Sequence, residues 1–469
     1  MSPPNANGLT NDDSNGLYNT SLPLEELSWT ITKNASVVSQ YLKAQQLLQP
    51  SKDAAGPSTI VPTDAPQHIQ LARQSLMAAA LEISQLAAGP SEFLPNLATG
   101  FQYISSLSWL CQYNIFHLVP LDSDIGYRSL SAAAHVSLQR LKSVIRMGMT
   151  AGLFRECLDG QSVKHSATSA LLARDADVYA YAMYMSNGSA RMAQEMAPAA
   201  SRWGPDSTQP HETAFNIALA TDLPFFEYLS RNPAEMQSFS AYMRNVRSSD
   251  GVALRHLVNG FAWDRIRDRG RVVDVGGSTG SAATALAEAF PHLRLVVQDL
   301  PANAERGRNM LQQSGGSIAQ RITFQAHDFT KPQPVHGADV YLLRMILHDW
   351  PDQAAIGIVR KIIDAMDKNQ PDARLLIMDT VLPKPGSVPV SVERILRARD
   401  LTMLQAFNSK ERDLDDWKHL LHRADGNLAL VNVVQPFGSA MSVLEVALGS
   451  SVHGEPKEGV NYFVAQELR

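Results

Sequence analysis

The fold of this chain is decided by the stretch Val272-Val273-Asp274-Val275-Gly276-Gly277-Ser278-Thr279-Gly280. An apolar run typical of a strand leads into a glycine-rich turn, and an alanine-rich segment typical of a helix follows. Glycine lets the backbone turn sharply and approach a ligand at points where a Cβ would collide. The stretch therefore predicts a strand, a ligand-binding turn and a helix in immediate succession.

Short β-branched runs alternate with helical segments from residue 271 onward. The predicted strands are 271–275, 293–298, 321–325, 338–345 and 374–378. The predicted helices are 281–289, 302–314, 353–367 and 413–423. This alternation favours a doubly wound α/β sheet. Two last apolar runs, 428–434 and 441–448, are joined by a short loop that contains glycine, which predicts an antiparallel hairpin closing the sheet.

The glycine turn does not match a dinucleotide fingerprint. That fingerprint reads Gly-x-Gly-x-x-Gly, and starting from Gly276 it would need glycine at Ser278 and at Ser281. The turn is instead preceded by Asp274, whose carboxylate suits a ligand that carries an ammonium group. A nicotinamide-dependent oxidoreductase is therefore disfavoured.

Two further acids follow the next two predicted strands. Asp299 lies 23 residues after Gly276, where an acid can accept both hydroxyls of a ribose. Asp328, in His327-Asp328-Phe329, can accept a hydrogen bond from an adenine amino group. Three acids at the ends of successive strands predict a site for a nucleoside-type ligand.

These residues resemble the S-adenosylmethionine-dependent methyltransferases, and among them the plant and fungal small-molecule O-methyltransferases. The overall look is closest to fungal enzymes that tailor polyketides and related aromatic metabolites. Weaker similarity extends upstream to about residue 95, and Ser278 stands where the family often has a third glycine. The resemblance is carried by 272–280, 298–301, 327–329, 343–352, 377–383 and 410–412.

The resemblance implies a Rossmann-like α/β fold and a cofactor. The expected fold is a seven-stranded methyltransferase sheet with an antiparallel last strand, plus an N-terminal, mainly helical winged-helix and dimerisation domain. S-adenosyl-L-methionine is the expected cofactor, and a homodimer is the expected assembly. The implied cofactor residues are Gly276, Gly277, Asp299, Asp328, Phe329, Arg344 and Trp350. Trp350 can cover the adenine face or simply pack in the core.

The resemblance also implies the catalytic residues. His348, in Leu347-His348-Asp349-Trp350, matches the general base, and Asp379 and Glu411 match two acids that flank it. Aspartate at 379 is shorter than the glutamate of many relatives, so its contact to His348 is less secure than that of Glu411. Met403, Phe407 and Asn408 lie on a helix that lines the acceptor pocket in relatives, although their spacing suits core packing equally well.

Methyl transfer from a sulfonium is an in-line displacement, so the protein must align the acceptor and take its proton. A phenol has a pKa of about 10 and an imidazole one of about 6.5, so complete prior deprotonation by His348 would cost roughly 5 kcal/mol. Proton removal assisted by the developing methyl–oxygen bond is therefore expected. A carboxylate on the other ring nitrogen would fix the tautomer and stabilise the imidazolium. No metal is implied, because there is no His-x-x-x-His pair and the candidate acids already have roles.

The N-terminal third is predicted to be mainly helical. Residues 22–49 and 68–88 are typical of helices, and 51–66, rich in Pro, Ser, Gly and Ala, is typical of a linker. An apolar stripe along 68–88 suits either the core or a subunit interface. Residues 1–21 are typical of a disordered tail, with neither a secretory signal nor a membrane-spanning run, so we expect a cytoplasmic protein without membrane contact.

Residues 125–169 have the pattern of a helix–turn–helix with a wing. The second helix carries, on it or nearby, the basic residues Arg140, Lys142 and Arg146. The alternative function is therefore that of a DNA-binding regulator, which would use the winged helix and keep the cofactor fold only as a vestige. The chain has 41 Lys and Arg against 46 Asp and Glu, a net charge of −5, which makes a poor phosphate-binding surface. Packing or dimerisation is therefore favoured for this module, and no nucleic-acid partner is expected.

The composition adds two bounds. With 45% hydrophobic residues the chain can build large cores, and with only Cys111 and Cys157 it cannot build a disulfide framework or an iron–sulfur cluster. We expect five segments: a flexible tail, helix and linker (1–66), a helical winged-helix dimerisation domain (67–175), a helical connecting region that contributes to the substrate pocket (176–249), the cofactor-binding catalytic domain (250–448), and a C-terminal extension (449–469).

Overall fold

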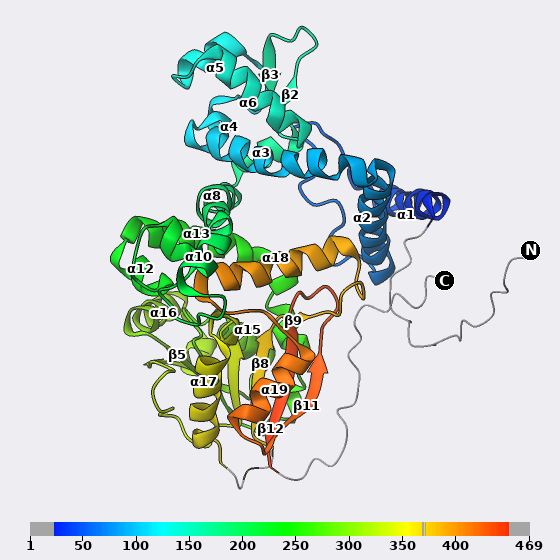
Figure 1. Ribbon diagram of the computed structural model, residues 1–469. Coiled ribbons are helices and arrows are strands. Elements are labelled where there is room, and N and C mark those ends of the chain that lie inside the picture. Colours follow the sequence, from blue (N-terminus) through cyan, green and yellow to red (C-terminus); the bar gives the residue numbers. More distant parts are fainter. Residues whose placement is uncertain (1–22, 368–369, 371, 450–469) are drawn as a thin grey trace, which may run out of the picture.

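The computed structural model of the protein describes residues 23–367, 370 and 372–449. The predicted disordered tail at 1–21, and all but the first residue of the predicted C-terminal extension, lie outside the described residues. In Figure 1 a helical part occupies the top, a sheet flanked by helices occupies the bottom, and helix α18 (Val390–Phe407) runs between them. Among the described residues, no helix combines the length and the apolar character needed to cross a membrane.

A seven-stranded sheet organises the lower part, in the order β11-β12-β8-β7-β4-β5-β6. Strands β4 to β8 run parallel, and β12 is antiparallel to both of its neighbours, β11 and β8. The doubly wound sheet and its closing antiparallel hairpin are therefore confirmed. The strand bounds are β4 Arg271–Val275, β5 Arg294–Asp299, β6 Ile322–Ala326, β7 Val340–Arg344, β8 Arg374–Asp379, β11 Leu428–Val434 and β12 Ser442–Leu448.

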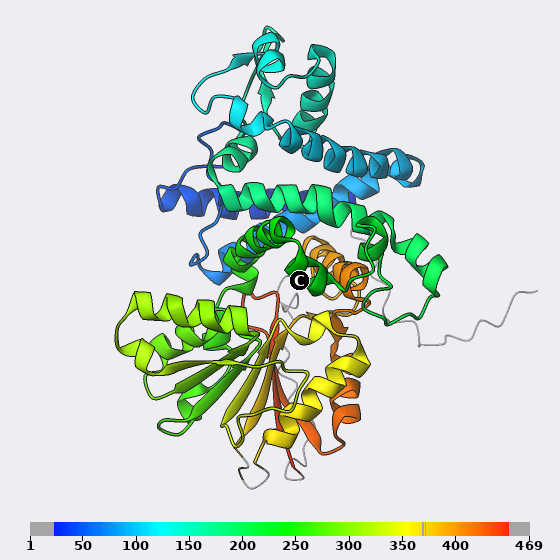
Figure 2. The same ribbon diagram turned by 90° about the vertical axis from the view of Figure 1, so that its left-hand side faces the viewer.

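The strands are apolar because helices cover both faces of the sheet. Along β4, Val272 packs into one core and Val273 into the other, as the two-residue period of a strand requires. Figure 2 shows the sheet nearly edge-on, with helices on its two sides. One face is covered by α14 Arg255–Asn259, α15 Ser281–Ala289 and α16 Pro301–Ser314, and the other by α17 Asp352–Ala365 and α19 Leu414–Ala424.

The N-terminal part is helical as predicted. Helices α1 and α2 pack along each other, and α2 also contacts α18. A π-helical turn, Met185–Ser189, joins α8 directly to α9. The helix bounds are α1 Leu24–Ala44, α2 Gln67–Ala88, α3 Phe93–Gln112, α4 Ile115–Leu118, α5 Tyr127–Ala133, α6 Leu138–Thr150, α7 Ala167–Arg174, α8 Ala176–Tyr184, α9 Ala190–Gln194, α10 Met196–Trp203, α11 Ala214–Ala218, α12 Phe225–Arg231 and α13 Pro233–Ser248.

A small winged-helix module lies within this part. Strand β1 precedes helices α5 and α6, and strands β2 and β3 follow them as the predicted wing; the three strands pair as an antiparallel sheet in the order β1-β3-β2. Its strands are β1 Ile125–Gly126, β2 Arg155–Glu156 and β3 Ser162–Lys164.

The segment 51–66 differs from a loose linker. Val61 and Ala65 are buried against α1 and α2, Asp53 forms a β-bridge with Ser166, and the Asp53 carboxylate pairs with Arg155 of the wing. Apolar side chains at two positions are enough to fold this Pro- and Ser-rich segment onto its neighbours. The apolar stripe of α2 divides accordingly: Ile69 and Ala72 are buried in this cluster, whereas Leu86 is 39% exposed.

The glycine turn after β4 is shaped by close contacts. A Cβ built on Gly277 would lie 2.4 Å from Asp274 Oδ2 and 2.9 Å from Val297 Cγ1, both in the packed sheet. Gly357 lies within helix α17, and a Cβ built on it would meet no atom beyond the backbone of its own helix within 4 Å.

Gly277→Ala is therefore expected to lower the free energy of unfolding by about 1–3 kcal/mol, because the added methyl overpacks the turn. The matched control Gly357→Ala is expected to raise it by about 0.5–1 kcal/mol, because alanine favours a helix. Denaturant unfolding followed by circular dichroism measures both. Equal effects of the two substitutions would contradict the tight turn.

Candidate active site

The turn between β4 and α15 points its backbone toward the carboxyl edge of the sheet. Gly276 and Gly280 take positive φ angles of 75° and 83°, and Ser278 takes one of 53° despite its side chain. The Ser278 N–H donates to Asp299 Oδ2 over 2.8 Å. A left-handed serine costs about 1–2 kcal/mol relative to right-handed backbone, and this hydrogen bond helps to hold it.

Asp299 ends β5 beside the turn. Its Oδ1 accepts hydrogen bonds from the Leu300 N–H and from the Asn303 amide, each over 2.8 Å. A carboxylate offers about four acceptor positions, so Asp299 is oriented by its neighbours and retains capacity for ligand hydroxyls.

Asp328 and Phe329 follow β6. Asp328 Oδ1 accepts from the Thr330 N–H and hydroxyl, and these hydrogen bonds are the main reason why the pKa of Asp328 is lowered, with burial opposing them. Phe329 meets Trp350 edge to face, with ring centroids 5.7 Å apart. Because a Cβ on Gly276 would lie 3.5 Å from Phe329 Cε1, this aromatic pair stands next to the glycine turn.

Asp274 is placed differently from the expectation that it would meet a ligand ammonium group. Its side chain is beneath the turn and 2% exposed, and burial raises its pKa to about 7. The Asp274 carboxyl is therefore part of the support of the turn and does not face the ligand surface.

These residues fit S-adenosylmethionine. A Cβ at Gly276 would lie 2.5 Å from Ile346 Cδ1, and Gly276 takes a positive φ of 75°, so this position of the turn favours glycine. Arg344, at the end of β7, keeps its Nε buried without a partner among the described residues. The sequence-predicted cofactor residues thus come together along the ends of β4, β5, β6 and β7.

His348 lies on a 3₁₀ turn, η6 (Leu347–Asp349), rather than on the strand end itself. Strand β7 ends at Arg344, and Met345 then takes a positive φ of 54°. This left-handed residue turns the chain away from the sheet, a strain of the kind that collects at functional sites. The sequence carries no signal for it, because methionine has no preference for that conformation.

A fully buried arginine holds this turn. The Arg412 guanidinium donates to the carbonyl oxygens of Leu347 and Trp350, each over 2.8 Å, and to Asp352 Oδ1 over 2.8 and 3.0 Å. Sequence reasoning did not assign Arg412 a role. It stands in the polar run Lys410-Glu411-Arg412-Asp413, which gives no indication that its side chain is buried.

Pairing of two short strands brings the two predicted acids together. Strand β9 (Val381–Leu382) runs parallel to β10 (Arg412–Asp413), in the register Arg412 to Val381. Glu411, just before β10, therefore lies beside the end of β8, where Asp379 is located. The Glu411 N–H also donates to Asp400 Oδ1 of α18 over 3.0 Å.

His348 contacts both acids, as the sequence predicted. Its Nδ1 is 3.0 Å from Glu411 Oε1 and 3.9 Å from Asp379 Oδ1, so the longer contact is the one to the shorter side chain. Asp379 is fully buried, and burial, opposed by His348 and assisted by the other acids, raises its pKa to about 7. Neither Asp379 oxygen has a hydrogen-bond partner among the described residues.

A third carboxylate faces the other ring nitrogen. Asp349 Oδ1 is 3.6 Å from His348 Nε2, and burial is the main cause that raises the Asp349 pKa to about 6. Burial alone would lower the pKa of His348, but the charges of Glu411, Asp379 and Asp349 outweigh it and raise this pKa to about 10. Asp349 was quoted in the motif without a role of its own.

The predicted acceptor residues stand at the end of α18. Phe407 stacks on Phe226, with ring centroids 5.5 Å apart, and meets Phe225 edge to face at 5.0 Å. Met403 is half-buried on the same helix. Asn408 ends α18 in a left-handed conformation, and its amide donates to the carbonyl oxygens of Gln209 and Glu212. Asn408 therefore ties the loop before α11 to the helix.

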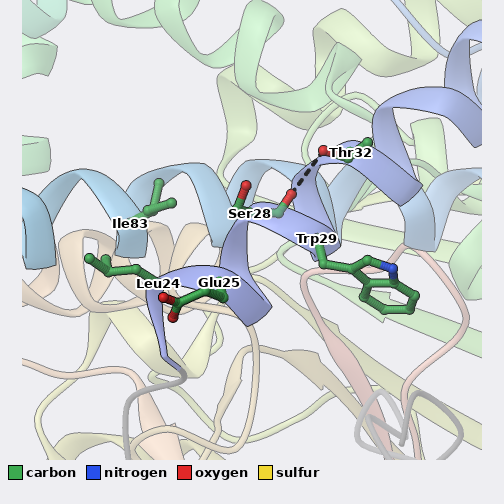
Figure 3. A pocket seen from close by; sticks show the side chains of 6 residues that line it. All are labelled: Leu24, Glu25, Ser28, Trp29, Thr32 and Ile83. Carbon is green, nitrogen blue, oxygen red and sulfur yellow. Dashed lines mark hydrogen bonds between the residues drawn. The ribbon is translucent and has the colours of Figure 1, made fainter.

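Within the described part of the chain, no group of three or more His, Cys, Asp or Glu side chains is arranged to hold a metal ion. A surface hollow of about 530 Å³ lies elsewhere, on α1 and α2, and none of its lining residues is a predicted site residue (Figure 3). It is lined by Leu24, Glu25, Ser28, Trp29, Thr32 and Ile83.

Comparison with known proteins agrees with this geometry. The family model of the O-methyltransferase domain matches residues 199–426. O-methyltransferase pgmB of Aspergillus terreus is 60% identical over 92% of this chain and 98% of its own length. O-methyltransferase VdtC of Byssochlamys spectabilis is 42% identical over 91% of this chain and 98% of its own.

Solved structures show the same fold. OxaC in complex with sinefungin and meleagrin has a TM-score of 0.68 at 23% identity, covering 89% of this chain and 99% of that one. LepI in complex with S-adenosylmethionine has a TM-score of 0.67 at 21% identity, covering 90% of this chain and 100% of that one. Because relatives that are 60% and 42% identical are covered over 98% of their length, the chain belongs to the family of S-adenosylmethionine-dependent O-methyltransferases.

Proposed function

We propose that this enzyme methylates a phenolic hydroxyl of an aromatic secondary metabolite, a polyketide by class, with His348 as general base. The observation that carries the proposal is the 3.0 Å contact between His348 Nδ1 and Glu411 Oε1. It commits Nδ1–H to the carboxylate, so that in the neutral imidazole the lone pair of Nε2 can take the acceptor proton.

The cofactor supplies a methyl group that is already activated on its sulfonium sulfur. Asp299 is oriented to accept ribose hydroxyls, and Asp328 keeps one oxygen free for an adenine amino group. Gly276 and Gly277 allow the tight turn that faces the cofactor, Arg344 ends β7 at the same edge, and Phe329 with Trp350 forms the aromatic wall. This assignment uses the residues that the sequence predicted.

The carboxylates around His348 tune its basicity. A phenol holds its proton with a pKa of about 10, against about 6.5 for an ordinary imidazole. Raising the pKa of His348 to about 10 nearly matches the two, so proton transfer within the site needs little free energy. Glu411 orients the ring, and Asp379 adds charge from the same side.

The acceptor is proposed to lie near the end of α18. Met403 and Phe407 present apolar and aromatic surface that suits a flat ring. Asn408 contributes by holding the loop at 209–212 rather than by a free amide.

We also propose a homodimer that uses the N-terminal helices. On α3, Phe93, Leu97 and Phe101 follow one face at four-residue spacing, and their exposed fractions are 61, 60 and 57%. Such a stripe in water is unfavourable and marks an interaction surface. The hollow in Figure 3 adds a second exposed apolar site, with Trp29 63% exposed.

The DNA-binding alternative is not favoured. Arg146 of α6 pairs with Glu156, and the Lys142 ammonium lies over the Tyr127 ring, 5.0 Å from its centroid. Cations engaged in this way are less available for phosphates.

We also propose the division of the chain into the segments 1–66, 67–175, 176–249, 250–448 and 449–469, and a cytoplasmic location of the protein.

Replacing the base tests the reaction. His348→Ala is expected to reduce methylation by about 10²–10⁴-fold, because the acceptor proton then has no positioned base. Binding of S-adenosylhomocysteine, measured by calorimetry, should be unchanged because the ribose and adenine contacts remain. The assay is a mass gain of one methyl on a panel of polyketide phenols. Full activity of the variant would contradict the assignment.

The pH profile tests the charge cluster. The neutral imidazole is the active form, so with a His348 pKa near 10 the wild-type kcat/KM should rise with pH across the neutral range. Glu411→Gln removes a charge that stabilises the imidazolium, so the rising limb should move to lower pH while the maximal rate falls. Glu411→Asp keeps the charge and should stay closer to wild type. The same phenol is used for all three enzymes, so its own ionisation contributes equally to every pH profile. Identical profiles of the wild type and Glu411→Gln would contradict an effect of Glu411 on the pKa of His348.

The assembly is tested at the α3 face. The wild-type protein should run at twice 51.3 kDa in light scattering coupled to size exclusion, and Leu97→Glu with Phe101→Glu should run as a monomer. Leu158→Glu is the matched control, since Leu158 is fully exposed on the wing and outside this face. A monomeric wild type, or a dimer that survives the double substitution, would contradict the proposed interface.

A further inference from the structure

Two glutamine side chains form a buried amide pair near the carboxyl edge of the sheet. Gln298 lies near the end of β5 and is 1% exposed, and Gln333, in the loop after β6, is 3% exposed. Gln298 Nε2 donates to Gln333 Oε1 over 2.7 Å, and Gln333 Nε2 donates to Gln298 Oε1 over 2.8 Å. Because Gln333 Oε1 also accepts from the Val335 N–H, the orientation of both amides is determined.

Gln298 is bonded to two further segments of the proposed cofactor site. Its carbonyl oxygen accepts from the N–H groups of Gly276 and Gly277, over 2.8 and 3.1 Å. Its side chain also donates to Gln325 Oε1 on β6, over 2.9 Å. Gln298 therefore joins the glycine turn, strand β6 and the loop that contains Gln333.

That loop, residues 327–339 between β6 and β7, carries Asp328 and is tied to β5 on both sides of it. Before Asp328, the His327 N–H donates to the Asp299 carbonyl oxygen over 2.9 Å. After Asp328, the Lys331 N–H closes a turn on the Asp328 carbonyl oxygen, also over 2.9 Å, and the amide pair then holds Gln333. The position of the Asp328 turn thus depends on both attachments.

An amide pair constrains a loop in a way that apolar packing does not. Apolar contacts are non-directional, whereas a hydrogen bond requires a narrow range of distance and angle. A buried polar pair with all its partners in place therefore makes its surroundings rigid. Recognition of a ligand amino group needs such rigidity, because the accepting oxygen must itself lie within hydrogen-bond distance and direction.

We propose that Gln298 and Gln333 are positioning residues for recognition of the adenine amino group. Their pair holds the loop 327–339 at the distance from the glycine turn at which the oxygen of Asp328 not used by Thr330 accepts from that amino group. This inference rests on the proposed placement of the adenine at Asp328. It assigns to the amide pair the selectivity of the site for adenine, as distinct from its overall affinity for the cofactor.

The experiment compares S-adenosylhomocysteine with its deaminated analogue, in which a hydrogen replaces the amino group of the adenine and the rest of the compound is unchanged. Both dissociation constants are measured by calorimetry on the full-length protein. The wild type is expected to bind S-adenosylhomocysteine about 10- to 100-fold more tightly, because the analogue leaves the oriented carboxylate without its donor. The ratio of the two constants reports the contact of Asp328 with the amino group.

Gln333→Leu is expected to reduce this ratio to about 3 or less, because the loop loses its second attachment to β5. The double variant Gln298→Leu with Gln333→Leu should give the same low ratio. It leaves neither amide of the pair buried without its partner, so it tests the inference even where the single variant folds poorly. Gln325→Leu is the matched control, since Gln325 bonds to Gln298 but lies outside the loop, and it should keep the wild-type ratio.

A wild-type ratio in both leucine variants would overturn the inference, even with both compounds bound more weakly, because a purely structural role lowers the two affinities together. An equal loss of the ratio in Gln325→Leu would assign selectivity to the sheet and not to the attachment of the loop, and so would also overturn it. The wild type alone tests the adenine placement. Equal binding of the two compounds by the wild type would contradict that placement, which is distinguishable from a failure of the variants.

Discussion

The active-site edge depends on one buried guanidinium. Arg412 is fully buried, and it spends its donors on two carbonyl oxygens of the 347–350 turn and on the Asp352 carboxylate. Because a buried charge that loses its partner costs about 3–5 kcal/mol, breaking these contacts would destabilise this edge of the sheet strongly. The same residue pairs with Val381 through β10, so one side chain and its backbone register place His348, Asp379 and Glu411 relative to one another.

Around His348, the charges of the carboxylates and the effect of burial shift the pKa of the imidazole in opposite directions. Three carboxylates within 4 Å of one imidazole form a cluster in which burial favours neutral groups and proximity favours the imidazolium. The balance is a base whose pKa is raised to about 10 beside an acid, Asp379, whose pKa is raised to about 7. The three acids at the proposed cofactor site also differ in burial. Asp274 is buried under the glycine turn, whereas Asp299 and Asp328 remain near the surface, and hydrogen bonds orient their oxygens.

Local patterns predicted the catalytic half of the fold closely. The bounds of β4 and α15 are those expected from the valine run and the alanine-rich helix, and the hairpin of β11 and β12 closes the sheet as predicted. The position of His348 on a 3₁₀ turn, beyond the end of β7, does not follow from the sequence, because the left-handed Met345 that turns the chain has no sequence signature. The segment 51–66 was taken for a linker, because composition does not show that Val61 and Ala65 find a core.

The sequence by itself predicted the residues of the site: the glycine turn and the acids at successive strand ends from local patterns, and His348 with its two acids from the family resemblance. It did so because strand periodicity, turn chemistry and motif spacing are local properties of the chain. Only the tertiary structure decided which of these residues touch. The contact of His348 with Glu411 and the burial of Arg412 join segments far apart in the chain, and they exist because packing of helices on both faces of the sheet brings those segments to one edge.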